Sequence, residues 1–198
     1  MRGIFEYLTS FFKHKDQVDI NMSYPEHPVD DTKVGDIYLL GYNSESEITE
    51  ETQEKRSHYS IIIDIAGEST HKDIIGLELH LGANEKTRDT RPLANRRIAE
   101  INRLVLVHHL GKIENISGHN LRFWEAELKD QGIKIYHDLV DEHGGKWSSA
   151  TNCHSYALRV LDQFGVRTDH LDLQDFSPLL IDVTILLNSL YLRVVDST

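Results

Sequence analysis

The sequence contains a single cysteine, Cys153, among its 198 residues. One thiol cannot form an intrachain disulfide, and it cannot build a zinc site of the four-thiolate or Cys-x-x-Cys kind. The sequence also lacks the run of about 18 apolar residues that a membrane-spanning helix needs. Polar residues interrupt the apolar positions of residues 1–13, which is unlike a secretion signal. These absences predict a cytoplasmic protein whose lone thiol either packs in the core or performs chemistry.

Basic charge is also scarce, because 21 Lys and Arg residues face 32 Asp and Glu residues, for a net charge of −11. This balance argues against a nucleic-acid partner, which a basic protein would favour. A length of 198 residues with 39% hydrophobic and 27% charged residues predicts one globular domain spanning residues 1–198. The exception to the acidic balance is the segment 83–103, which is locally basic. We interpret it either as a solvated loop or as a site for an anionic head group or partner.

Apolar periodicity divides the chain into strands and helices. Runs rich in β-branched and other apolar residues predict strands over 35–40, 57–65, 74–81 and 103–110, with 57–65 and 74–81 as a hairpin. Helical spacing predicts helices over 3–14, from 121 to about Gly132, over 153–164, and from an N-cap at Ser177 onward. The polar segment 41–57 predicts a loop. The resulting fold class is α+β.

The helix over 3–14 is amphipathic, and two placements remain open for it. It either docks on the core or lies at a membrane surface, which would give the protein a peripheral membrane contact.

The helix that begins at Cys153 has the clearest pattern in the sequence. Its apolar positions recur at i, i+3, i+4, i+7, i+8 and i+11, and Gly165 follows as a stop signal: Cys153, Tyr156, Ala157, Val160, Leu161 and Phe164. Thr151 and Asn152 are N-cap residue types directly before it. The dipole and the free N–H groups of a helix N-terminus favour the reactive thiolate form of a cysteine placed there.

A nucleophilic thiol needs a base and a third group that orients the base. Among the 12 histidines, His58 opens one predicted strand and His80 lies near the end of the next. If the two strands pair, both imidazoles can project toward one end of the sheet, where a helix packed on that sheet could place Cys153. Taken singly, each histidine is more simply a surface or satisfied strand residue.

Four segments resemble, in order, the landmarks of the lecithin retinol acyltransferase-like family, a circularly permuted branch of the papain-like thiol hydrolases. They are Gly35-Asp36-Ile37, Ser57-His58-Tyr59-Ser60-Ile61, Leu77-Glu78-Leu79-His80-Leu81 and Thr151-Asn152-Cys153-His154-Ser155-Tyr156. The resemblance implies a papain-like catalytic core over 34–165, in which a small antiparallel sheet packs against the cysteine helix. Residues 1–33 would form an N-terminal helix and connection, and 166–198 a C-terminal helical extension. Ser60 and the His-Ser-Tyr after the cysteine depart from the family pattern.

The resemblance also implies roles for single residues. Cys153 would be the nucleophile, His58 the general base and His80 the orienting residue of a cofactor-free hydrolase or acyltransferase that forms a thioester, with lipid acyl esters as substrates. The candidate substrate-binding residues are Tyr59, Asn152, Arg96 and Arg97.

Two alternatives remain open at this point. The sequence also resembles the PPPDE isopeptidases, which would make peptides or ubiquitin-like conjugates the substrates; a non-catalytic interaction module of the same fold is the other. No metal site is expected, since His137, Asp141 and His143 lack a further spaced ligand.

Overall fold

A computed structural model describes residues 24–42, 56–114, 116, 120–173 and 176–183 of the chain. Its elements, in chain order, are β1 (Asp36–Tyr42), β2 (Arg56–Asp64), β3 (Asp73–Ala83), β4 (Thr90–Glu100), η2 (Ile101–Arg103), β5 (Leu106–Lys112), α2 (Leu121–His143), α3 (Cys153–Gln163) and β6 (Ser177–Pro178). The predicted helix over 3–14, most of the predicted loop 41–57 and the helical pattern beyond residue 183 lie outside the described residues.

The strands form one sheet in the order β4-β3-β2-β1-β5, and every neighbouring pair on this path is antiparallel. The short β6 pairs in parallel with the start of β2. The predicted hairpin is confirmed, since Ser60 of β2 lies opposite His80 of β3 and Ile63 opposite Leu77. The α+β class with a small, mostly antiparallel sheet is therefore correct.

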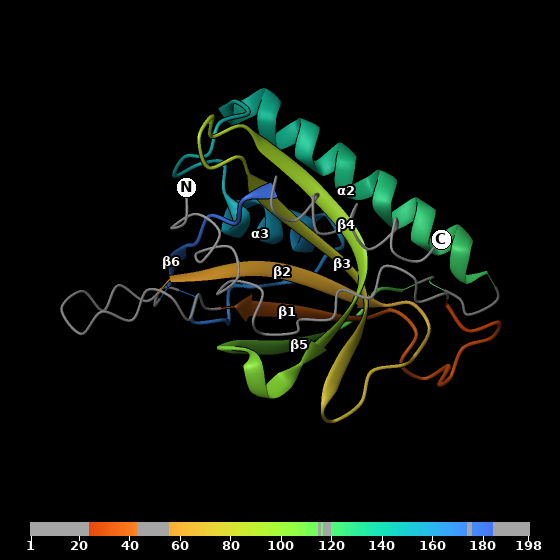
Figure 1. Cartoon of the computed structure of the whole chain (residues 1–198). Coiled ribbons are helices and arrows are strands. Elements are labelled where there is room, and N and C mark those ends of the chain that lie inside the picture. The colour runs from red at the N-terminus through yellow and green to blue at the C-terminus, as the bar shows by residue number, and fades with distance from the viewer. Residues whose placement is uncertain (1–23, 43–55, 115, 117–119, 174–175, 184–198) are drawn as a thin grey trace, which may run out of the picture.

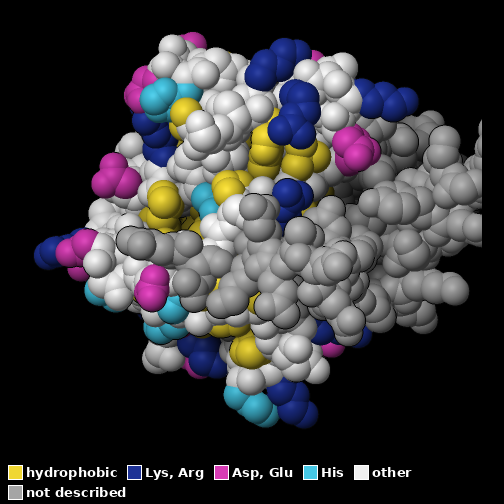
Figure 2. Space-filling model, turned by 90° about the vertical axis from the view of Figure 1, so that its left-hand side faces the viewer, with side chains coloured by type: hydrophobic (Ala, Val, Ile, Leu, Met, Phe, Trp, Pro, Cys, Tyr) yellow, Lys and Arg dark blue, Asp and Glu magenta, His cyan; other side chains and the backbone are white. Residues whose placement is uncertain are grey.

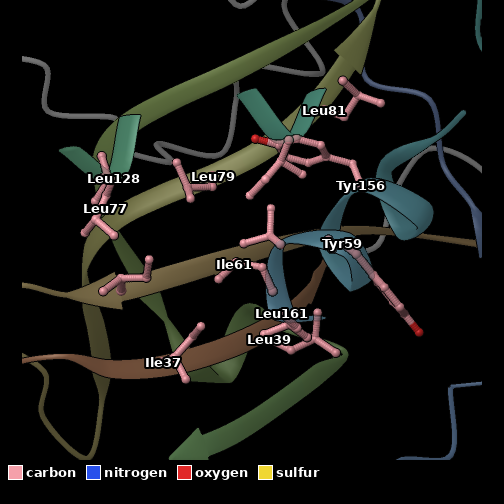
Figure 3. Close-up of a cluster of buried hydrophobic side chains, with 14 of the residues drawn as sticks. Ile37, Leu39, Tyr59, Ile61, Leu77, Leu79, Leu81, Leu128, Tyr156 and Leu161 are labelled. Atoms are coloured by element: carbon pink, nitrogen blue, oxygen red, sulfur yellow. The ribbon is translucent and has the colours of Figure 1, made fainter. Parts of the chain in front are cut away.

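Both helices cover the same face of the sheet (Figure 1). Figure 3 shows the core between these layers, in which side chains of β1, β2 and β3 point toward Tyr156 and Leu161 of α3 and Leu128 of α2. Alternate strand residues build this core, among them Ile37 and Leu39 of β1 and Tyr59, Ile61 and Ile63 of β2. Successive side chains of a strand point to opposite faces, so the residues between them face away from the helices.

The face away from the helices carries a smaller apolar cluster. Leu40, Ile62, Ile74 and Ala99 are buried there, and Ile101 and Leu104 of the short connection between β4 and β5 pack against them. This connection joins strands at opposite edges of the sheet, so it crosses the second face and shields it. Both faces of the central strands are therefore buried, and every residue of β2 after Arg56 is buried.

The structure differs from the predictions for one strand and for the end of one helix. Within the segment 83–103, residues 90–100 form strand β4, paired along its length with β3, instead of a solvated loop. Helix α2 continues past Gly132 to His143. Gly132 permits close helix packing instead of ending the helix, because a Cβ there would lie 3.0 Å from the Tyr156 hydroxyl. That hydroxyl donates a 3.0 Å hydrogen bond to the Gly132 carbonyl.

The C-terminal end of the described chain also differs from the prediction. Ser177 was expected to cap a helix, but Ser177 and Pro178 form β6 and pair with Arg56 and Ser57 of β2. Three residues later the chain reaches the end of β3, where the Ala83 N–H donates to the Ile181 carbonyl at 2.9 Å. We call residues 176–183 the C-terminal insert. Among the described helices, none has both the length and the apolar character needed to cross a membrane.

Candidate active site

Cys153 is the first residue of α3, as the sequence predicts, and Asn152 is its N-cap. The Asn152 Oδ1 accepts hydrogen bonds from the backbone N–H groups of His154 and Ser155, both at 3.0 Å. The Ser155 hydroxyl in turn accepts from the Asn152 N–H at 2.9 Å, which completes a capping box. The cap thus uses the N–H groups of His154 and Ser155 at the start of the helix. The Cys153 N–H is not used by the cap and can donate to a substrate oxygen.

The thiol of Cys153 is completely buried. It donates to the backbone carbonyl of Leu179 at 3.6 Å, and the Ser57 carbonyl lies at 3.9 Å. Burial raises the pKa of the thiol to about 12, although backbone N–H groups of Tyr59, His154 and Cys153 itself act in the opposite direction. In this arrangement the helix start does not produce a thiolate, because loss of hydration outweighs the helix N-terminus.

His58 and His80 meet on the second face of the sheet. The Nε2 atom of His58 lies 2.9 Å from the Nδ1 atom of His80, a hydrogen-bonding distance. Both rings are buried, with 1% and 5% of their surface exposed. The strand pairing explains the contact, because Ser60 lies directly opposite His80 and His58 is on the same face two residues earlier.

The histidine pair continues into an ion pair whose carboxylate is buried. The Nε2 atom of His80 lies 4.0 Å from a carboxylate oxygen of Glu78. Arg97 of β4 donates to both carboxylate oxygens at 3.1 and 3.2 Å, and the Tyr42 hydroxyl donates at 3.2 Å. We call His58, His80, Glu78, Arg97 and Tyr42 the histidine relay.

The charges of the relay follow from its burial and its partners. Burial alone would raise the pKa of Glu78, but Arg97 and the two imidazoles lower it to about 2, so the carboxylate is ionised. Burial lowers the pKa of His58 well below its usual value, and the adjacent His80 lowers it further. Burial also lowers the pKa of His80, which Glu78 partly opposes. Both imidazoles are therefore neutral at pH 7.

The charge of Glu78 favours one placement of the protons in the histidine pair. An ionised Glu78 can only accept, so it favours the proton of His80 on Nε2 and leaves Nδ1 of His80 as an acceptor. His58 then donates from Nε2, which leaves its Nδ1 with a free lone pair. This Nδ1 atom is buried and has no hydrogen-bond partner among the described residues. A buried imidazole nitrogen with a free lone pair has the form that a general base requires.

The thiol and this nitrogen are not hydrogen bonded to each other. Among the described residues, the thiol donates instead to the carbonyls of Ser57 and Leu179. Cys153 lies on the helix face of β2, whereas His58 belongs to the opposite face. The Leu179 backbone approaches both groups, since its carbonyl accepts from the thiol and its proximity raises the pKa of His58. Leu179 of the C-terminal insert is therefore close to both the candidate nucleophile and the candidate base.

The four candidate substrate-binding residues are separated in the structure. Tyr59 is buried on the helix face and its ring stacks on His154 at 3.6 Å, and Asn152 is engaged in the helix cap. Arg96 and Arg97 are neighbours on β4 and so face opposite ways. Arg96 pairs with Glu68 and lies 4.4 Å from the ring centre of Tyr24. Arg97 belongs to the histidine relay.

Sequence reasoning missed Glu78, Tyr42 and Leu179. A signal for Glu78 was present, because it stands two residues before His80 in an otherwise apolar strand and therefore shares its face. Tyr42 and Leu179 approach through strand pairing and tertiary packing, which carry no local signature. Within the described residues, no group of three or more His, Cys, Asp or Glu side chains is arranged to hold a metal ion.

Comparison of the chain with family models, with curated proteins and with solved structures finds no match.

Proposed function

We propose that the protein is a cysteine-dependent acyl-transfer enzyme, a hydrolase or acyltransferase, in which Cys153 is the nucleophile, His58 the general base and His80 the residue that orients the base. One observation carries the proposal: the buried side chains of Glu78, His80 and His58 follow one another, and the last of them ends in a buried Nδ1 atom close to Leu179, whose carbonyl accepts from the Cys153 thiol. A permuted papain-like arrangement over residues 34–165 agrees with the chain order of these residues.

The reaction follows the usual steps of thiol acyl transfer. When the substrate is bound, Nδ1 of His58 takes the proton of Cys153, and the thiolate attacks the acyl carbonyl carbon. The tetrahedral intermediate collapses to a thioester, and the leaving alcohol or amine takes the proton from His58. Water or an acceptor then gives a proton to His58 and attacks the thioester, which releases the acyl product and restores the thiol. The Cys153 N–H is the candidate donor to the oxyanion.

Glu78 acts in this scheme as a positioning residue. Its ionised carboxylate holds the His80 proton on Nε2 and so keeps His58 in the tautomer that can accept a proton. When His58 becomes an imidazolium, the charge is stabilised through His80 by the same carboxylate.

Trapping of the thioester tests the proposal. The full chain is incubated for hours with p-nitrophenyl esters of a fatty acid or of a blocked peptide, and intact mass spectrometry detects acylation. We expect one acyl group, absent from Cys153→Ala, and a rate at least about 100-fold lower in His58→Ala, which is the range of general-base contributions. His137→Ala, on the exposed side of α2, serves as the matched histidine control and should react like the unaltered chain.

Comparison of the fatty-acid ester with the peptide ester shows whether the enzyme prefers lipid or peptide acyl groups. Equal acylation of the unaltered chain and His58→Ala would contradict the proposal. It would favour the non-catalytic module, for which the complete burial of the thiol is the supporting observation.

A further inference from the structure

Strands β2 and β3 separate at one end of the sheet. Their pairing runs from Ile63–Leu77 to Ser60–His80, although β2 begins at Arg56 and β3 continues to Ala83. We call the gap between residues 56–59 of β2 and 81–83 of β3 the notch. In Figure 1 it lies at the end of the sheet where β6 is drawn, and Figure 2 views the molecule from this side. On this side of the molecule, hydrophobic side chains reach the surface between lysine and arginine side chains (Figure 2).

The C-terminal insert fills the notch through its main chain. It pairs in parallel with Arg56 and Ser57, and the Leu179 N–H donates to the Ser57 carbonyl at 2.9 Å. After crossing the gap, its Ile181 carbonyl accepts from the Ala83 N–H at 2.9 Å. These bonds satisfy strand edges that would otherwise be unpaired, and they involve only backbone atoms of the insert.

The insert also places the Leu179 carbonyl next to both the candidate nucleophile and the candidate base. The Leu179 oxygen accepts from the Cys153 thiol at 3.6 Å, and the Leu179 backbone approaches His58. A substrate carbonyl must enter the space between a nucleophile and its base in acyl transfer. The insert therefore occupies the place that a substrate would take.

We propose that the notch is a binding site for an extended peptide main chain, the substrate of the proposed acyl transfer, and that the C-terminal insert occupies it as an internal pseudosubstrate. That the bound peptide is a substrate rests on the proposed function. The peptide site itself is inferred from the strand pairing.

The hydrogen bonds of the notch favour a peptide over a lipid ester. The Ser57 carbonyl accepts from the Leu179 N–H at 2.9 Å, although His154 Nε2 also lies 3.0 Å from it, and the Ala83 N–H donates to a carbonyl farther along the same chain. A peptide supplies both, as in recognition by strand addition. An ester-linked acyl chain has no N–H group and would leave the Ser57 carbonyl without its Leu179 partner.

Gly82 offers a way to empty the notch without touching the thiol or the relay. A Cβ at this position would lie 2.6 Å from Val183 Cγ1 and 3.0 Å from the Ile181 carbonyl, so Gly82→Ala should displace the insert. Gly145→Ala is the matched control, because its new Cβ would make only an ordinary 3.6 Å contact with Val140.

The test measures alkylation of the full chain by iodoacetamide, which intact mass reports unambiguously because Cys153 is the only thiol. We expect the unaltered chain and Gly145→Ala to react slowly and Gly82→Ala to react at least tenfold faster. A blocked synthetic peptide of residues 176–183, added to Gly82→Ala, should restore slow alkylation. The same peptide methylated on the Leu179 nitrogen, which cannot donate to Ser57, should not.

Two outcomes would overturn the inference. One is a folded Gly82→Ala chain that reacts as slowly as the unaltered chain, and the other is equal protection by the methylated and unmethylated peptides. If Gly82→Ala fails to fold, Leu179→Pro is used in its place, because proline at position 179 has no N–H group to donate to the Ser57 carbonyl. Alkylation reports access to the thiol and not turnover. A failure of His58-dependent acylation therefore overturns the proposed function alone, whereas loss of peptide protection overturns the peptide site alone.

Discussion

The two faces of the sheet differ in chemistry although the same strands build both. The helix face is closed by α2 and α3 over an apolar core, and it holds the thiol at one end. The second face has a smaller apolar cluster, and beside it lies the histidine relay with an ion pair. The nucleophile and the base thus come from opposite faces, and they can meet only at the notch, where β2 and β3 separate. The difference shows that one face supplies stability while the other holds the polar groups of the candidate site.

Truncation of the helix-face core should give the largest loss of stability. Tyr156 is completely buried and its hydroxyl bonds to the Gly132 carbonyl. Tyr156→Ala removes a large buried ring and should cost about 3–5 kcal/mol of unfolding free energy in urea titrations. Tyr156→Phe keeps the ring and removes one hydrogen bond, so it should cost about 1 kcal/mol. Equal losses would show that packing is not the main contribution of this face.

Neutralising Glu78 should give the next largest effect. Glu78→Gln removes the carboxylate that pairs with Arg97 and accepts a hydrogen bond from Tyr42. We expect this change to lower the unfolding free energy by about 1.5–3 kcal/mol. Glu100→Gln is the matched control, because Glu100 forms an exposed ion pair with Arg103 and should cost less than about 1 kcal/mol. Glu78→Gln should also slow thioester formation. A full rate in this variant would remove Glu78 from its positioning role.

The stability of the second face should depend on pH in a defined direction. His58 and His80 have lowered pKa values in the folded chain, so below about pH 6.5 the unfolded chain binds more protons than the folded chain. Stability is therefore fully present above that pH and falls as the pH decreases, by up to about 1.4 kcal/mol per pH unit for each histidine. Urea titrations between pH 7.5 and 5 should show a smaller slope in His58→Asn, and the slope of His137→Asn should be unchanged. A slope in His58→Asn as steep as in the unaltered chain would mean that His58 is not buried in its neutral form.

The helix cap beside the thiol should give the smallest effect. Asn152→Ala removes the acceptor for two backbone N–H groups and should cost about 1 kcal/mol of unfolding free energy. Asn152→Asp keeps this acceptor but loses the donors to the Ser148 and Ser149 carbonyls, so its cost should be intermediate. If Asn152→Asp were as unstable as Asn152→Ala, the hydrogen bonds donated to Ser148 and Ser149, and not the accepted ones, would be the main contribution of Asn152 to stability.

Much of the central fold follows from local patterns. Four predicted strands and the α3 helix with its Asn152 cap and Gly165 stop are present in the structure. These elements have either β-branched runs or helical periodicity, which are local signals. Strand β4 was missed because two of its basic residues pair with acidic partners on opposite faces of the sheet, Arg96 with Glu68 and Arg97 with the buried Glu78. A charged strand of this kind cannot be distinguished from a solvated loop without knowing its neighbours.

The candidate site was predictable only in part. The proximity of His58 and His80 followed from the hairpin, and the placement of Cys153 followed from the cap. The face of each residue did not follow, because nearly all of β2 is buried and its sequence shows no apolar–polar alternation. The position of the C-terminal insert could not be predicted either, because Ser177 and Pro178 pair through the main chain, which leaves no pattern in the side chains.

The pH profile of thiol alkylation tests most directly whether the thiol and His58 pair once the insert leaves the notch. Iodoacetamide alkylation is measured from pH 5 to pH 10 for Gly82→Ala and for the same chain carrying His58→Ala as well. We predict a midpoint below about pH 8.5, the ordinary value of a thiol, in Gly82→Ala, and a return to that value or above when His58 is removed. The same midpoint in both chains would show that the base does not reach the thiol, and would contradict the account.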